Sequence, residues 1–235
     1  MNKPKTDESE NDDGIERINK VPFHDLEIEK EIKEQCDILI KKYFDDRKYV
    51  ETKVKNWGDA FLNDLEFFCK KKSKYIFCLS LRIDSLKFYP IDFTNYLKRN
   101  KKDGYVNYKY KLQFLNIDID ILYIEKFNIK KNINFDINSI QNIIKTIISN
   151  VIDERPYSKE KITEYAKYIL EDSQKSIKSI INKFNYFRTL IITKIPKLTT
   201  FCNKTANCNE NLFCFSMNYS TNEISCEMVY FIYIP

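Results

Sequence analysis

The hydrophobic positions of the segment 54–81 follow two periods in succession. Its first part has apolar residues three or four positions apart, the period of a helix that buries one face. Three consecutive lysines, Lys70–Lys72, then crowd the end of this helix, where positive charge complements the helix dipole. The following run is aromatic and aliphatic, which is typical of a buried strand. The pattern predicts a helix over about 52–71 that leads directly into a strand over 74–83.

Another helix is predicted before this segment, over about 26–44, with Asp25 as its N-cap and acidic residues in its first turn. After the strand, residues 84–104 are mixed in character and contain Pro90 and Gly104 as breakers, with room for a short strand near 86–93. Two alternating segments then predict strands, 105–115 and 117–129. The first half of the chain thus reads as two helices followed by three or four strands.

The second half begins again in the same way. Asp136 caps a helix that extends to about Val151, and Ser158 starts a longer helix that extends to about Phe184. A strand over 186–195 and a polar loop over 197–211 follow. Two more strands are predicted at the end of the chain, 212–219 and 224–234. The last strand is too apolar for one face to be solvated, so we expect it in the middle of a sheet.

The two halves share one offset of 108 residues. With this shift Ile32 falls on Ile140, and Val54 falls on Ile162. Any two amphipathic helices can be slid into phase, but here both helices and the connector between them keep the same offset, which favours a duplicated domain over two unrelated helical hairpins. The predicted organisation is a tail and two domains, with the bounds 1–20, 21–130 and 131–235.

Length and composition narrow the class of protein. The chain has 235 residues, of which 43% are hydrophobic, so both halves have enough apolar side chains for a core. No apolar run approaches the ~18–20 residues that span a bilayer, and the polar N-terminus does not resemble an export signal. We therefore expect a cytosolic protein without a membrane partner. Residues 1–20 are polar and acidic, which predicts a disordered tail, either a solubilising leader or a docking arm.

A net charge of +5 raises the question of nucleic-acid binding. Only six of the 39 basic residues are arginines, the residue type that makes bidentate contacts with bases and phosphates. The excess of Lys, Asn, Ile, Tyr and Phe is what AT-rich codons produce. Nucleic-acid binding is therefore a disfavoured alternative.

Catalytic chemistry has few candidate residues in this sequence. The single histidine, His24, lies beside the predicted tail, and three glycines cannot form a Gly-rich phosphate loop. Asp118 and Asp120 alternate on one strand and could pair as carboxylates, but a solvent-facing side of the strand is the favoured interpretation. We expect neither an enzyme nor a cofactor.

Seven cysteines raise the question of a metal site. Three of them, Cys36, Cys69 and Cys78, lie on predicted apolar faces, where Cys behaves as a small hydrophobe. The other four lie close together in sequence but lack the C-x-x-C spacing of a zinc site: Cys202, Cys208, Cys214 and Cys226. Reduced core thiols are the favoured interpretation, and a zinc site is the alternative.

The most specific motifs lie in the first repeat. The second helix opens V-K-N-W at 54–57, and the strand after it opens K-Y-I at 74–76. The second repeat keeps this pattern more loosely, and ends with C-F at 214–215 and S-T-N-E at 220–223. In these features the chain resembles the Tctex-type dynein light chains, over about 20–129 and 133–235. It departs from them in two places, because the first repeat lacks the Cys-Phe strand and the second is one strand short before its C-terminus.

The resemblance implies an α+β fold of two tandem modules, each with two helices and a three- or four-stranded antiparallel sheet. Because members of that family are usually single domains that form homodimers, two copies in one chain imply an intramolecular pseudo-dimer that is monomeric in solution. The implied function is that of a noncatalytic subunit of a cytoplasmic or axonemal dynein complex, bound to the cytoskeleton through the motor. A motor-independent interaction scaffold is the alternative.

Partners implied by the resemblance are the dynein intermediate chain and cargo peptides. They would bind by strand addition, in which an extended peptide pairs with an exposed sheet edge. The candidate edge segments are 105–115 and 212–219. On the second of these we expect the partner-binding residues to be Phe213, Cys214, Phe215, Ser216 and Met217.

Overall fold

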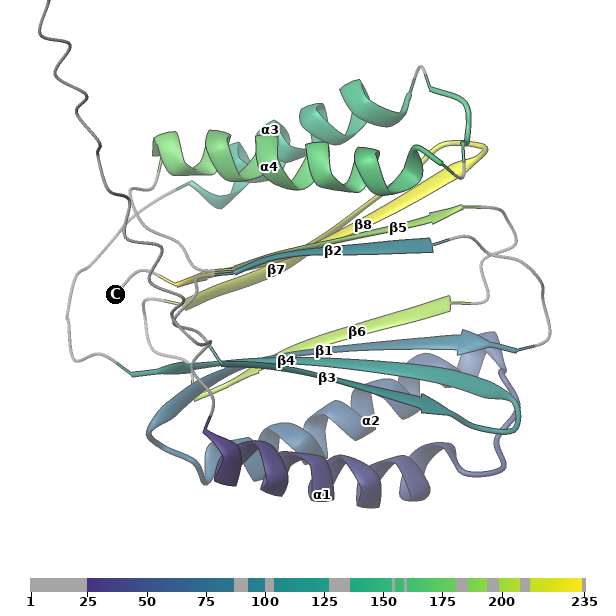
Figure 1. Ribbon diagram of the computed structural model, residues 1–235, viewed down its shortest axis with the longest axis vertical. Coiled ribbons are helices and arrows are strands. Elements are labelled where there is room, and N and C mark those ends of the chain that lie inside the picture. Colours follow the sequence, from purple (N-terminus) through teal and green to yellow (C-terminus); the bar gives the residue numbers. More distant parts are fainter. Residues whose placement is uncertain are drawn as a thin grey trace, which may run out of the picture.

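The chain folds into four layers, in the order helices, sheet, sheet, helices (Figure 1). A computed structural model describes nine stretches of it: 25–86, 93–99, 104–126, 136–153, 155–158, 160–180, 186–193, 199–207 and 212–233. Within these residues the fold is α+β, with four helices and two antiparallel sheets of four strands each. None of the described helices combines the length and hydropathy that crossing a bilayer requires.

The helices form two pairs. The first pair consists of α1 (Leu26–Phe44) and α2 (Glu51–Lys70), and the second of α3 (Ile137–Ile152) and α4 (Ile162–Ile180). Asp25 and Asp136 cap α1 and α3 as predicted, because the Asp25 carboxylate accepts from the Ile28 N–H and the Asp136 carboxylate from the Asn138 N–H. The last helix begins later than expected, since the Ser158 carbonyl first accepts two N–H groups in a tight turn.

In both sheets, some strands that are neighbours in space are far apart in the sequence. The first sheet has the order β3-β4-β1-β6 and the second sheet the order β2-β5-β8-β7. The strands of the first half are β1 (Tyr75–Ser85), β2 (Phe93–Arg99), β3 (Gly104–Lys111) and β4 (Leu115–Glu125). Those of the second half are β5 (Tyr186–Thr193), β6 (Thr199–Ala206), β7 (Leu212–Ser220) and β8 (Ile224–Tyr233). The position of β8 between two neighbours confirms that it is a central strand.

The two halves exchange a strand with each other. Strand β2 leaves the first half and pairs with β5, with Phe93 opposite Ile192. Strand β6 leaves the second half and pairs with β1, with Cys202 opposite Leu81. The division at residue 130 therefore separates the two helix pairs, but each sheet contains strands from both sides of it.

Two sequence predictions are corrected by these strands. The expected loop 197–211 contains β6, and the second half has four strands rather than one too few. The mixed segment contains β2 at 93–99, whereas most of the short strand considered near 86–93 lies outside the described residues. Both missed strands lie at a sheet edge and pair with the other half, so local sequence carries little of the information that makes them strands.

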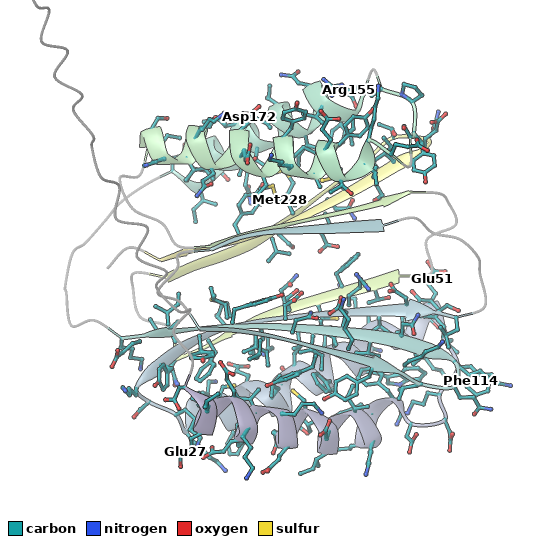
Figure 2. All side chains as sticks on the ribbon, in the orientation of Figure 1. Glu27, Glu51, Phe114, Arg155, Asp172 and Met228 are labelled. Carbon is teal, nitrogen blue, oxygen red and sulfur yellow. The ribbon has the colours of Figure 1, made fainter. Side chains whose placement is uncertain are left out.

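Three hydrophobic cores fill the spaces between the layers. One lies between α1–α2 and the first sheet, and includes Phe61 and Tyr123. Another lies between α3–α4 and the second sheet, where Figure 2 shows Met228 of β8 beneath α4. A smaller cluster joins the two sheets, in which Val229 packs with residues of the first sheet such as Leu122.

The buried positions of the helices repeat with the predicted offset of 108 residues. All six buried residues of α2 correspond at this offset to buried residues of α4. In order they are Val54, Gly58, Phe61, Leu62, Leu65 and Cys69, matched by Ile162, Ala166, Ile169, Leu170, Ser173 and Ile177. The offset of 108 residues found in the sequence thus also relates the buried positions of α2 to those of α4.

Candidate interaction surfaces at the sheet edges

The two segments proposed for strand addition lie at sheet edges. The segment 105–115 includes most of β3, which is the outer strand of the first sheet, and 212–219 is most of β7, which is the outer strand of the second sheet. Among the described strands, each is paired on one side only, to β4 and to β8 respectively. Backbone groups on the other side of an edge strand are available to pair with another extended chain.

The expected binding residues 213–217 all lie in β7, where they pair with β8. Met217 contacts the core beneath α3 and α4, so its side chain is not a free anchor for a partner. Ser216, on the opposite face, is exposed. The side chains of Phe213, Cys214 and Phe215 lie outside the described residues. What β7 offers to a partner is therefore its backbone, together with the exposed face that carries Ser216.

The C-terminal end of β7 is attached to α3. The Tyr219 hydroxyl donates to both carboxylate oxygens of Asp153, each at 2.8 Å. This hydrogen bond raises the pKa of Tyr219. The contact fixes the helix and the edge strand relative to each other at one end, beyond the residues 213–217.

The other edge, β3, is bounded by charged and aromatic side chains. Lys33 of α1 lies 5.7 and 5.1 Å from the ring centroids of Tyr108 and Tyr110, and it pairs with Asp37. The Tyr110 hydroxyl donates to Asp37 at 2.7 Å. Burial opposes ionisation of Asp37, but hydrogen bonds from Lys33 and Tyr110 prevail and lower its pKa. This cluster fills the corner between α1 and β3.

The exchanged strand β6 is fastened to α2 along its length. Lys204 pairs with Glu66 at 2.6 Å. Just beyond the strand, the Asn207 amide donates to the carbonyls of Cys69, Lys72 and Tyr75 at 2.9 to 3.0 Å. These carbonyls belong to the end of α2 and the start of β1, where backbone acceptors lack helical partners. Asn207 adopts a positive φ of 58°, a conformation that Asn tolerates better than most residues.

Asp118 and Asp120 do not face solvent, contrary to the favoured prediction. They are 5% and 1% exposed and lie on the face of the first sheet that is turned toward the second. The Asn107 amide donates to both carboxylates, and the guanidinium of Arg82 lies 3.4 Å from Asp118. The alternation predicted the shared face of the two acids but not its burial, because the second sheet that covers it was not foreseen. Their neighbours make them part of a buried polar network between the sheets.

Two of the four cysteines considered as alternative zinc ligands, Cys202 and Cys226, lie in different hydrophobic cores. Cys202 belongs to the core under α2, whereas Cys226 belongs to the separate core under α4. Zinc–sulfur bonds of about 2.3 Å require ligands from one cluster, so these two cannot share an ion. Burial also raises the pKa of Cys202 to about 12, which keeps it a thiol at neutral pH. Cys208, and the side chain of Cys214, lie outside the described residues.

The remaining chemical candidates do not form a site in the described part of the chain. Gly58 lies inside α2 and Gly104 begins β3, so neither belongs to a phosphate-binding loop, and His24 and Gly14 lie outside the described residues. The residues described here contain no cluster of three or more His, Cys, Asp or Glu able to hold a metal ion.

Comparison with known proteins gives no relative from which to transfer a function. A scan against protein families finds no family that matches the chain, and a search of curated proteins finds no match.

Proposed function

We propose that this chain is a noncatalytic adaptor, a subunit similar to the Tctex-type dynein light chains in which two modules of one polypeptide form a pseudo-dimer. In this proposal it holds an extended segment of a dynein intermediate chain or a cargo protein by strand addition. The single observation that carries the proposal is the reciprocal exchange of β2 and β6 between two units of the same construction.

The exchange supports a pseudo-dimer because each half contributes one edge strand to the sheet of the other half, at the equivalent position. Each sheet runs from an outer strand of its own half, through two more strands of that half, to a strand contributed by the other half. The buried positions of α2 and α4 repeat at one offset, as a duplication requires. Two equivalent subunits that exchange an edge strand would have this arrangement if their chains were joined.

Strand addition is supported by the character of β7. The strand has the sequence L-F-C-F-S-M-N-Y-S, which contains neither a charge nor a proline. Charged residues and prolines are the usual means by which proteins protect edge strands against pairing. An edge without them suits a protein whose function is to accept another strand.

Two experiments test the proposal. Intermediate-chain peptides titrated into the purified protein should bind with heat changes that fit a low-micromolar to high-micromolar dissociation constant, and the absence of binding at high micromolar peptide would contradict it. Tagging the protein in its own cell and identifying the chains that purify with it tests the assignment to a motor. Motor subunits among them support it, whereas other partners alone would support a motor-independent scaffold instead.

A further inference from the structure

Part of strand β7 is exposed on the face of the second sheet that is turned toward the first sheet. Ser216 and Ser220 are exposed, although the residues directly opposite them on β8, Val229 and Ser225, are 4% and 5% exposed. Opposite residues of an antiparallel pair share one face of the sheet. On this face the protein therefore covers β8 but leaves β7 exposed at Ser216, Asn218 and Ser220, beyond the end where β7 contacts β6 of the first sheet.

The helix next to β7 is almost free of charge. Of the 16 residues of α3, only Lys145 is charged, and the nine residues of β7 include no charge at all. By contrast, α1 has nine charged residues among 19. Depletion of charge is characteristic of the central part of protein interfaces. Because α3 contacts β7, the two elements together form a surface with one charged residue, Lys145, which we call the α3–β7 edge.

The corresponding corner of the first half is occupied. There Lys33 and Asp37 contact the tyrosines of β3, and β3 itself exposes Lys109 and Lys111. With the offset of 108 residues, Lys33 corresponds to Gln141 and Asp37 to Lys145, so the ion pair has no counterpart on α3.

The other two edge strands also carry positive charge. Strand β6 has Lys204, which is held by Glu66, and β2 ends with Lys98 and Arg99. Of the four edge strands, β7 is the one whose sequence has no charged residue. An incoming strand would meet lysine at every edge except this one, and lysine on an edge discourages pairing.

We infer that the pseudo-dimer is functionally one-sided: the α3–β7 edge binds one extended, uncharged peptide segment per chain, and the β3 edge binds none. The occupant must be an extended polypeptide, because none of the described strands pairs with the outer side of β7. It must be uncharged at its centre, because α3 and β7 offer a single lysine to compensate a buried charge. This inference rests on the proposed strand addition and adds the edge, the stoichiometry and the chemistry of the peptide.

The test uses the full chain and a probe obtained by selection. Random decapeptides displayed on phage are selected on the immobilised protein, and the strongest binder is synthesised with acetylated and amidated ends. We expect a peptide without charged residues at its central positions, bound at one site per chain in calorimetry. Backbone amide shifts should change within 216–220 and along α3, and not within β3.

Edge variants then separate binding at β7 from binding elsewhere. Asn218→Lys and Ser216→Lys each place a charge on the open edge and should weaken the peptide at least tenfold. Ser179→Lys on the exposed side of α4 is the matched control and should leave affinity unchanged. The amide map of the unaltered protein does not depend on any variant folding correctly.

The remaining outcomes overturn the inference in different ways. Selected peptides that bind but shift β3 or β6, that carry central charges, or that bind at two sites per chain would refute the one-sided edge while leaving strand addition intact. If no decapeptide binds the chain, strand addition itself fails, and the proposed function fails with it.

Discussion

Gly58 of α2 lies against Cys202 of β6, although the two residues come from different halves of the chain. A Cβ atom on Gly58 would be 2.7 Å from the Cys202 sulfur and 3.2 Å from the Ile83 Cδ1 atom. Glycine thus allows α2 to approach the exchanged strand closely. Its counterpart on α4 at the offset of 108 is Ala166, which is also buried and is larger by one methyl group.

Gly58→Ala should lower the free energy of unfolding. Overpacking in a core costs about 1–3 kcal/mol, and we expect this to exceed the ~1 kcal/mol that alanine gains in helix propensity. The same change should cost less in a Cys202→Ala background, because the obstructing sulfur is gone. Chemical denaturation of the two single variants and the double variant measures this coupling. An equal cost in both backgrounds would show that α2 and β6 are not in contact.

Asn207→Ala should destabilise the protein by about 1–3 kcal/mol, because it removes the side-chain hydrogen bonds that attach the end of β6 to the end of α2 and the start of β1. Three carbonyls of the first half accept from this one amide of the second half. Asn222→Ala, at an exposed position in the turn before β8, is the control and should have little effect in the same denaturation experiment. Similar stabilities for the two variants would count against the attachment of β6 to α2.

Arg82→Ala should be among the most damaging substitutions on the first sheet. The guanidinium contacts Asp84 at 2.9 Å and Asp118 at 3.4 Å, in an environment where its side chain is 6% exposed. Removing one partner from a buried ion pair costs about 3–5 kcal/mol, since the other charge remains buried. Lys42→Ala breaks an exposed pair with Asp64 and should cost far less stability than Arg82→Ala. Thermal unfolding of both variants measures the two losses of stability. Equal losses would show that the network around Arg82 is solvated.

The carboxyl group of Asp25 should make the stability of the first half depend on pH in the acidic range. Its pKa is lowered, chiefly by the hydrogen bond from the Tyr75 hydroxyl at 2.5 Å. A carboxyl whose pKa is lower in the folded state contributes stability above its unfolded pKa, about 4, and loses it as the pH falls through the folded value.

Asp25→Asn should therefore destabilise the protein at pH 7, by about 1 kcal/mol or less, and the difference should shrink below about pH 4. Denaturation curves between pH 3 and pH 7 measure the effect. Tyr75→Phe removes the same hydrogen bond and should show the same dependence on pH. A difference that grows toward low pH would contradict the assignment.

Local sequence was sufficient to predict the elements that bury an amphipathic face within their own half. The apolar stripe of α2, the cap of α1 by Asp25 and the central position of β8 all follow from the spacing of residues near each other in the chain. The edge positions of β3 and β7 also follow, because alternating strands of mixed polarity suit an edge.

The exchange of strands could not be predicted in this way. Strand β6 has the sequence T-T-F-C-N-K-T-A, whose polarity resembles a loop, and it is held by β1 and α2 of the other half. The burial of Asp118 and Asp120 depends on the same long-range arrangement, since the second sheet covers them. What the sequence did contain was an asymmetry in charge between α1 and α3, which becomes informative once β3 and β7 are known to be edges.

Cleavage of the chain between its two helix pairs tests the interlocked arrangement most directly. A protease site placed after residue 130 cuts the polypeptide without removing any strand from either sheet. Light scattering after gel filtration should find the intact protein as a monomer of about 28.3 kDa, and the cleaved protein should keep this mass under native conditions while two fragments separate in denaturant. Fragments that part from each other without denaturant would show that β2 and β6 are not exchanged between the halves.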